Sequence, residues 1–207
     1  MPIVLRSKKP ATIALDQYRA LKAHILFWQN QQPKTLVITS AAPRAGTSAT
    51  VANLAALLAY SGLDVLAIDA CFKYPKLHRI FQVPNTEGLT TYLTQPYKSE
   101  SVIQESPSWP VHILPSGPLP AYAAELLAPS AMRKLFDTLK REYAIILIDA
   151  PNILEAADTM VLSALVDGVL LVIPSGRHPR QVEMKALAQL KHARAQVIGT
   201  VLTDVTL

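Results

Sequence analysis

The stretch TLVITSAAPRAGTSATVANLAALLAY, residues 35–60, decides the fold. It begins with an apolar run at 35–40, passes through a short loop and ends in an alanine-rich segment typical of a helix. Strand, tight loop and helix in this order form phosphate-binding loops, in which backbone N–H groups and the helix N-terminus face the anion. Gly46 and Ser48 match the last glycine and the metal-binding hydroxyl of such a loop, but Thr47 replaces the lysine. The alternative is an ordinary strand-to-helix turn capped by Thr47 or Ser48.

Short, nearly continuous apolar runs recur along the chain, and helical patterns separate most of them. Continuous apolar runs indicate parallel strands buried on both faces, and the alternation predicts a doubly wound α/β fold with a mainly parallel sheet. Strands are expected at 35–40, 64–69, 111–114, 144–149, 168–174 and 196–202, and helices at 12–30, 48–61, 130–141, 155–166 and 180–194. The proline-rich region 83–120 is expected to be irregular, with one short helix near 88–94. We expect one domain over residues 1–207.

Three of the expected strands end in segments that can carry chemistry. These segments are SAAPRAGTS, IDACFKYP and LIDAP, which follow the first, second and fourth strands. Ligands of such sheets bind at the carboxyl ends of the strands, so Gly46, Ser48, Asp69 and Asp149 should meet in one crevice. Two strand-terminal carboxylates beside such a loop favour Mg²⁺ binding, although each could instead cap a helix or hold a turn.

Composition and charge narrow the possible classes of protein. Of the 207 residues, 50% are hydrophobic, which argues against disorder, and the single Cys71 excludes an internal disulfide. We interpret Cys71 as a plain thiol rather than a nucleophile or metal ligand, because no second cysteine or suitably spaced histidine accompanies it. The start of the sequence reads as neither signal peptide nor anchor, and no apolar run could span a bilayer. The net charge of +5 is clustered at 73–79 and 177–194, which favours solvated faces over an acidic partner.

Several segments, in order, resemble the bacterial tyrosine kinases (BY-kinases) of capsule and exopolysaccharide synthesis. The type resembled is CpsD/CapB, in which the cytoplasmic domain is a separate chain. LDQYRALKAHI resembles the charged N-terminal helix of this family, and SAAPRAGTSATVANLA resembles its Walker A segment. VLAIDACFKYPKLHRIF resembles the Walker A′ segment, and IILIDAPNILEAADTMVL resembles Walker B. The match spans nearly the whole chain and implies a P-loop NTPase-like fold related to the MinD/ParA proteins.

The resemblance assigns roles to individual positions. It implies that Asp69 would be catalytic in an active protein and that Ser48, Asp69 and Asp149 would hold Mg²⁺. It implies that the charged helix mediates oligomerisation through Asp16, Arg19 and Lys22, although a solvated face with an ion pair from Asp16 to Arg19 would explain the same pattern. The nucleotide-binding positions it implies are Pro43, Arg44, Ala45, Gly46, Thr47, Ser48 and Ala49.

The sequence also departs from the family's motifs at functional positions. Thr47 replaces the Walker lysine, Arg44 replaces a glycine, and Cys71 replaces the second Walker A′ acid. Lys73 replaces an arginine, and Thr203 replaces an asparagine that is associated with the nucleotide base in related ATPases. The family's C-terminal tyrosine cluster, its autophosphorylation substrate, has no counterpart after Tyr143 in this sequence.

These departures lead to a functional hypothesis with alternatives. We expect a degenerate kinase, in effect a pseudokinase, that binds Mg²⁺ with ATP or ADP weakly if at all. It would regulate capsule or exopolysaccharide synthesis from the cytoplasm, at the inner face of the membrane. Its partner would be a transmembrane polysaccharide co-polymerase or a related kinase, with a homo-oligomer left open and nucleic acid not favoured. The alternatives are an active or residually active tyrosine kinase or ATPase, and a positioning protein of the MinD/ParA kind.

Overall fold

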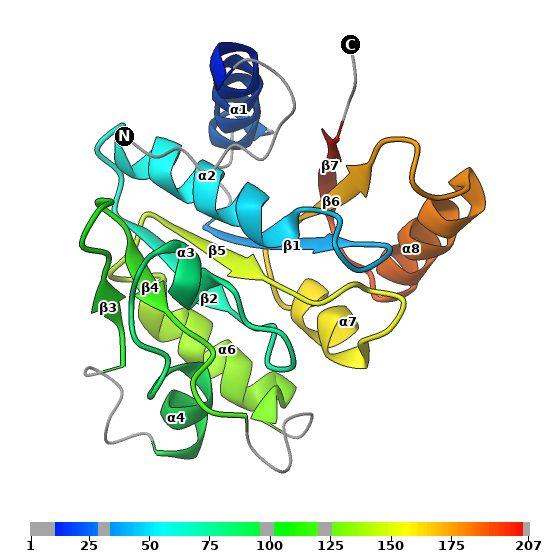
Figure 1. Cartoon of the computed structure of the whole chain (residues 1–207). Helices are drawn as coiled ribbons and strands as arrows, with labels where there is room; N and C mark the ends of the chain where they lie inside the picture. Colours follow the sequence, from blue (N-terminus) through cyan, green and yellow to red (C-terminus); the bar gives the residue numbers. More distant parts are fainter. Residues whose placement is uncertain (1–10, 29–33, 96–101, 120–125, 205–207) are drawn as a thin grey trace.

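The structure, a computed structural model, describes residues 11–28, 34–95, 102–119 and 126–204. Within these residues one sheet has the strand order β3-β4-β2-β5-β1-β6-β7, and every neighbouring pair is parallel except β3 with β4. The strands are β1 (Thr35–Ser40), β2 (Val65–Asp69), β3 (Gln104–Glu105), β4 (His112–Leu114), β5 (Ile145–Asp149), β6 (Gly168–Pro174) and β7 (Val197–Thr203). The expected doubly wound, mainly parallel sheet is therefore confirmed (Figure 1).

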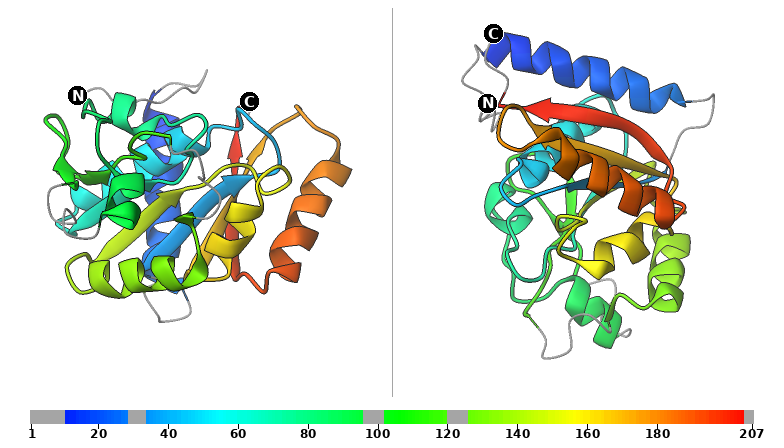
Figure 2. Two further views of the ribbon diagram at one scale, coloured as in Figure 1. Left: turned by 90° about the horizontal axis from the view of Figure 1, so that it is seen from below. Right: turned by 90° about the vertical axis from the view of Figure 1, so that its right-hand side faces the viewer.

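Helices cover both faces of this sheet, as the two views of Figure 2 show. Every residue of β1, β2 and β5 is buried, because these central strands have apolar neighbours on both sides. One core lies under α1, α2 and α3, and the other lies under α4, α6, α7 and α8. The bounds are α1 (Ala11–Leu26), α2 (Thr47–Ala59), α3 (Leu77–Ile80), α4 (Leu89–Thr94), α6 (Pro129–Leu139), α7 (Ala157–Ser163) and α8 (Arg180–His192).

The structure differs from the sequence-based expectation in a few elements. Helix α1 ends at Leu26, before the expected end at residue 30, and residues 29–30 lie outside the described residues. The region 83–120 contains β3, a two-residue strand antiparallel to β4, in addition to the expected helix α4. Helix α3 was also not expected, because four residues are too few to show a helical period. Among the helices of the described residues, none has both the length and the apolarity to cross a bilayer.

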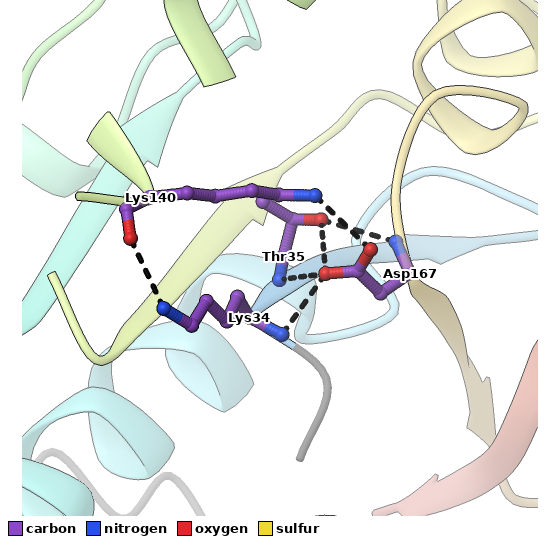
Figure 3. Close-up of polar contacts among 4 residues, drawn as sticks. All are labelled: Lys34, Thr35, Lys140 and Asp167. Atoms are coloured by element: carbon purple, nitrogen blue, oxygen red, sulfur yellow. Dashed lines mark hydrogen bonds and ion pairs between the residues drawn. The ribbon is translucent and has the colours of Figure 1, made fainter. Parts of the chain in front are cut away.

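A polar joint at the amino ends of β1 and β6 ties three segments together (Figure 3). The Asp167 carboxylate accepts hydrogen bonds from the backbone N–H groups of Lys34 and Thr35, at 2.9 and 2.8 Å, and from the Thr35 hydroxyl at 2.9 Å. Lys140, the residue that follows α6, forms a 3.0 Å ion pair with the other oxygen. Burial would raise the pKa of Asp167, but the contacts of Lys140 and Thr35 outweigh burial and lower it. The joint therefore fixes where β1 and β6 begin.

Candidate functional site

The candidate site lies where β1, β2 and β5 end. Asp69 and Asp149 are the last residues of neighbouring parallel strands and are direct register partners. One side-chain oxygen of each and the Cys71 Sγ all lie within 4.8 Å of one another. β5 lies between β2 and β1, so the segment that follows β1 starts beside the same cluster. The structure thus places Asp69 and Asp149 together, as the switch-point argument predicts.

The segment after β1 has the shape of a phosphate-binding loop. Helix α2 begins at Thr47, and Gly46 before it has a φ of +92°. A side chain at Gly46 would be strained at this φ, and its Cβ would lie 3.4 Å from the Thr203 Cγ2 atom. Arg44 has a φ of +62°, which explains why the resembled family has glycine there. The first turn of α2 leaves backbone N–H groups without intrahelical acceptors, which is the arrangement that binds anions.

The other predicted loop residues differ in exposure. Pro43 and Arg44 are exposed and Ala45 is buried, whereas Thr47, Ser48 and Ala49 are half-buried at the start of α2. In the described residues, no hydrogen bond or ion pair from the Arg44 guanidinium is recorded.

Two residues brace the loop from the far end of the chain, and sequence reasoning assigned them no such role. The Thr203 hydroxyl at the end of β7 donates a 2.8 Å hydrogen bond to the Ala45 carbonyl. The Arg177 guanidinium donates to the Arg44 carbonyl at 3.3 Å and forms a 2.8 Å ion pair with Asp204. The only sequence signals were the asparagine-to-threonine departure at Thr203 and the place of Arg177 in a basic cluster. Both contacts use loop carbonyls, so they leave the loop N–H groups free to face a ligand.

Asp69 holds the loop that follows β2. One oxygen accepts the Cys71 N–H at 3.0 Å, and the other accepts the N–H groups of Lys76 and Leu77 at 2.9 Å each. Burial raises the pKa of Asp69 to about 6, although these backbone hydrogen bonds oppose the rise. These hydrogen bonds show that Asp69 holds the turn after β2, which was the alternative to metal binding. They also explain why α3 starts at Leu77. A carboxylate has about four lone-pair sites, so one remains for a further ligand.

Asp149 differs from Asp69 because, within the described residues, no donor is in good hydrogen-bonding geometry with its carboxylate, and the Ser48 hydroxyl is only nearby. Both oxygens are buried, and within the described residues neither is in hydrogen-bonding geometry with a donor. Burial raises the pKa of Asp149 well above its ordinary value, Asp69 raises it further, and the nearby Ser48 hydroxyl lowers it. An unpartnered buried carboxylate and a neighbouring hydroxyl fit a Mg²⁺ ion, which is typically held by one or two carboxylates together with substrate phosphates.

Cys71 does not fit Mg²⁺ in the same way. Its thiol is half-buried and lies 3.7 Å from the Asp149 carbonyl oxygen. Burial raises the pKa of the Cys71 thiol well above its ordinary value, and the charges of Asp149 and Asp69 raise it further. Mg²⁺ prefers oxygen ligands, and sulfur is a soft donor. The oxygen donors of the cluster therefore suit Mg²⁺ and the thiol does not.

The buried acid pair predicts an unusual pH dependence of stability. The folded-state pKa values of Asp69, about 6, and Asp149 both exceed the ordinary 3.8, so the folded protein binds more protons than the unfolded chain between these values. The free energy of unfolding contributed by this pair therefore falls as the pH rises from about 4 through 6. Asp149→Asn should raise the melting temperature at pH 8 by roughly 2–8 °C, or about 1–2 kcal/mol, and change it little at pH 4.5.

Thermal unfolding followed by circular dichroism at both pH values checks this prediction. The matched control is Asp137→Asn, because Asp137 is an exposed aspartate on α6. A stabilisation of the same size at pH 8 and pH 4.5 would contradict the buried-charge explanation.

Helix α1 carries two of the three predicted oligomerisation residues, Asp16 and Arg19, on its outer side. Arg19 and Asp16 form a 3.0 Å ion pair and are more than 60% exposed, whereas Lys22 is half-buried. The opposite side packs on the body through Ile25, and the His24 ring nitrogen lies 3.1 Å from the Ile198 carbonyl oxygen. The ion pair is the one expected for a solvated helix face, and it leaves both residues accessible to a partner.

Comparisons with known proteins agree on one class and one family. No family model matches the chain. The chain is 35% identical over 200 residues to the tyrosine-protein kinase YwqD of Bacillus subtilis, covering 96% of this chain and 84% of that protein. It is 31% identical over 202 residues to the putative tyrosine-protein kinase CapB of Staphylococcus aureus, covering 97% of this chain and 88% of that protein.

Solved structures give the same result. The kinase domain of the Escherichia coli tyrosine kinase ETK superposes with a TM-score of 0.91 at 29% identity, over 99% of this chain and 80% of that one. MinD of Pyrococcus horikoshii, solved with Mg-ADP, superposes with a TM-score of 0.69 at 25% identity, over 82% of this chain and 69% of that one. Fold and loop thus define a P-loop NTPase-like α/β protein. Within this class, the chain belongs to the bacterial tyrosine-protein kinase family, and MinD is a more distant relative in fold.

Proposed function

We propose that this chain is a pseudokinase of its family, which acts by binding rather than by phosphoryl transfer. The observation that carries the proposal is the start of α2, where Thr47, directly after Gly46, occupies the position of the Walker lysine. Charge-assisted hydrogen bonds contribute roughly 1.5–3 kcal/mol each, so the loss of the lysine weakens ATP binding by about 10-fold to over 100-fold. The loss is larger in the transition state, where a comparable cation contributes roughly 10³–10⁵ in rate.

The Cys71 thiol, beside Asp69 and Asp149, would cause a second loss of catalytic rate. A general base accepts the proton of the attacking hydroxyl and typically contributes about 10²–10⁴ in rate. Because burial raises the pKa of the Cys71 thiol, this group is protonated at neutral pH and cannot accept that proton. Asp69 keeps a carboxylate at the site, but three backbone N–H groups already occupy its oxygens. The proposal is therefore that both the binding of the nucleotide and the proton transfer are weakened.

The proposed pseudokinase would keep some capacity to bind nucleotide. Ser48 and Asp149 would hold Mg²⁺, with Asp69 beside them, and Gly46 and the first turn of α2 would receive phosphate oxygens. Bound Mg²⁺ would neutralise phosphate charge. The Thr203 and Arg177 contacts would keep the loop open for the phosphates by holding its carbonyl groups away from the anion.

Turnover tests the proposal directly. We expect tyrosine phosphorylation and ATP hydrolysis by the purified chain with Mg²⁺ to lie close to background, at least about 10³-fold below the ~1–100 s⁻¹ typical of kinases. Radiolabelled ATP, a tyrosine-rich peptide and the chain itself as acceptors check this expectation. Mg²⁺-dependent turnover in the usual range, abolished by Asp149→Asn, would instead support the active-kinase alternative, which the retained Asp69 and Asp149 keep open.

The cellular role follows from the family rather than from the site. Related proteins include a putative tyrosine-protein kinase in the cps region of Klebsiella pneumoniae, which is 25% identical over 205 residues and 28% covered by this chain. We propose that the chain regulates capsule or exopolysaccharide synthesis as one cytoplasmic domain at the inner face of the membrane. Its partner would be a transmembrane polysaccharide co-polymerase or an active kinase subunit.

Helix α1 is the surface that we propose for assembly. Arg19→Glu reverses the charge of an exposed residue whose ion pair with Asp16 contributes little to stability. We expect the variant to keep the melting temperature of the unaltered chain and to shift any concentration-dependent association by about tenfold or more. Light scattering over a concentration series, with and without a kinase subunit of the family, measures this. Identical association of the two chains would leave the solvated-face interpretation standing.

A further inference from the structure

The cluster of Asp69, Cys71 and Asp149 differs chemically from an ordinary Mg²⁺ site. Its three donor atoms come from the ends of β2 and β5 and lie within 4.8 Å of one another. In a tetrahedral Zn²⁺ site, metal–ligand distances of 2.0–2.3 Å place neighbouring ligand atoms about 3.3–3.8 Å apart. The three donor atoms therefore lie slightly farther apart than, or at, the spacing that one such ion requires.

The unpartnered Asp149 carboxylate points to a cation. Both oxygens are buried, and no donor within the described residues satisfies either of them. An ionised carboxylate that is buried without a partner is unfavourable, and either protonation or a bound cation offsets this. The nearby Ser48 hydroxyl and the exposed Lys76 lower the pKa of Asp149, but burial and the charge of Asp69 outweigh them.

The thiol decides which cation suits the site. Mg²⁺ requires six oxygen ligands at short distances, whereas Zn²⁺ and Co²⁺ accept four ligands that include thiolate. Cys71 donates its S–H only weakly to the Asp149 carbonyl, at 3.7 Å, so its sulfur is available. Asp69 keeps one free lone-pair site, and Asp149, with only the Ser48 hydroxyl nearby, keeps most of its sites.

We propose that, in the absence of nucleotide, Asp69, Cys71 and Asp149 bind a divalent cation that accepts a thiolate ligand, such as Zn²⁺. On binding, the Cys71 S–H bond breaks, a metal–sulfur bond forms and one proton is released to solvent. Three protein ligands leave a fourth position for water. The replacement of a carboxylate by Cys71 thus changes the metal preference of the site as well as weakening kinase chemistry.

Cobalt and zinc titrations without nucleotide test this proposal. Because the sequence has one cysteine, a thiolate-to-Co²⁺ charge-transfer absorption reports Cys71 alone. We expect this band to saturate at one equivalent of Co²⁺ and to disappear when Zn²⁺ is added. Calorimetry should show Zn²⁺ binding at least about 100-fold weaker in Cys71→Ser and about 10-fold weaker in Asp149→Asn. The control His192→Gln, which removes an exposed imidazole on α8, should bind Zn²⁺ unchanged.

A measurement on the unaltered chain covers the case in which a variant does not fold. Zn²⁺ at one equivalent should protect the half-buried Cys71 from alkylation, and Mg²⁺ at the same concentration should not. Absence of the cobalt band at one equivalent, equal Zn²⁺ affinity of a folded Cys71→Ser variant, or alkylation unaffected by Zn²⁺ would overturn the proposal. None of these results depends on nucleotide binding. If the cluster does not bind Zn²⁺, the proposed pseudokinase role is unaffected, because turnover measurements test it separately.

Discussion

The triple variant Thr47→Lys, Arg44→Gly, Cys71→Asp is expected to phosphorylate a tyrosine-rich peptide at least about 10³-fold faster than the unaltered chain. Thr47→Lys returns a cation that reaches the β and γ phosphates. Arg44→Gly suits the left-handed conformation of this position, whose φ is +62°. Cys71→Asp returns a carboxylate beside Asp149, where the thiol is protonated at neutral pH. Radiolabel transfer from ATP to the peptide measures the rate.

The control for this gain is the same triple variant carrying Asp149→Asn. It should lose most of the restored rate, because the unpartnered carboxylate proposed to hold Mg²⁺ is removed. Autophosphorylation should stay poor, and the supplied peptide should be a better substrate than the chain. A triple variant that folds, binds ATP and yet remains as slow as the unaltered chain would show that the motif changes do not explain the loss of catalysis.

Asp167→Ala should destabilise the protein more than any other single change discussed for it. The carboxylate accepts four hydrogen bonds that tie β1 to the segments before β6 and after α6 (Figure 3). Bonds to a charged acceptor contribute roughly 1.5–3 kcal/mol each but are not additive, so we expect a loss of about 3 kcal/mol. For a chain of this size that lowers the melting temperature by roughly 6–12 °C.

The pH dependence of this effect has the opposite sign from that of Asp149. The folded-state pKa of Asp167 is lowered, so its stabilisation is present above the unfolded-state pKa and is lost as the pH falls through the folded-state value. The difference in melting temperature between Asp167→Ala and the unaltered chain should therefore shrink in acid. The exposed Asp137→Ala is the matched control and should change the melting temperature by less than about 2 °C. A small, pH-independent effect of Asp167→Ala would contradict the role given to the joint.

The fold could be predicted because its strands are buried on both faces. A continuous apolar run such as 145–149 admits few interpretations, and the order of strands and helices then restricts the sheet to a doubly wound topology. The switch-point rule places Asp69 and Asp149 at the same edge without any further information, and they are register partners in the structure. Short elements could not be predicted in this way, because β3 and α3 are too short to show a period.

The details of the site depended on contacts between distant segments. Sequence reasoning favoured metal binding by Asp69 over a turn-holding role, and only the structure shows three backbone N–H groups on its oxygens. Thr203 and Arg177 brace the phosphate loop from more than 130 residues away, as the sequence separations of 158 and 133 show. No local pattern encodes such pairs, because the carbonyl groups that they contact exist at every residue. The unpartnered state of Asp149 was likewise visible only once its surroundings were placed.

Calorimetric titration of Mg²⁺·ATP into the unaltered chain and into Thr47→Lys tests the central claim most directly. The account holds that Thr47 at the start of α2 deprives the loop of its phosphate-binding cation. It predicts that Thr47→Lys binds Mg²⁺·ATP at least about 10-fold more tightly than the unaltered chain, by the charge-assisted hydrogen bond alone. Equal and tight binding by both chains would contradict the account, because Thr47 would then not weaken the binding of Mg²⁺·ATP.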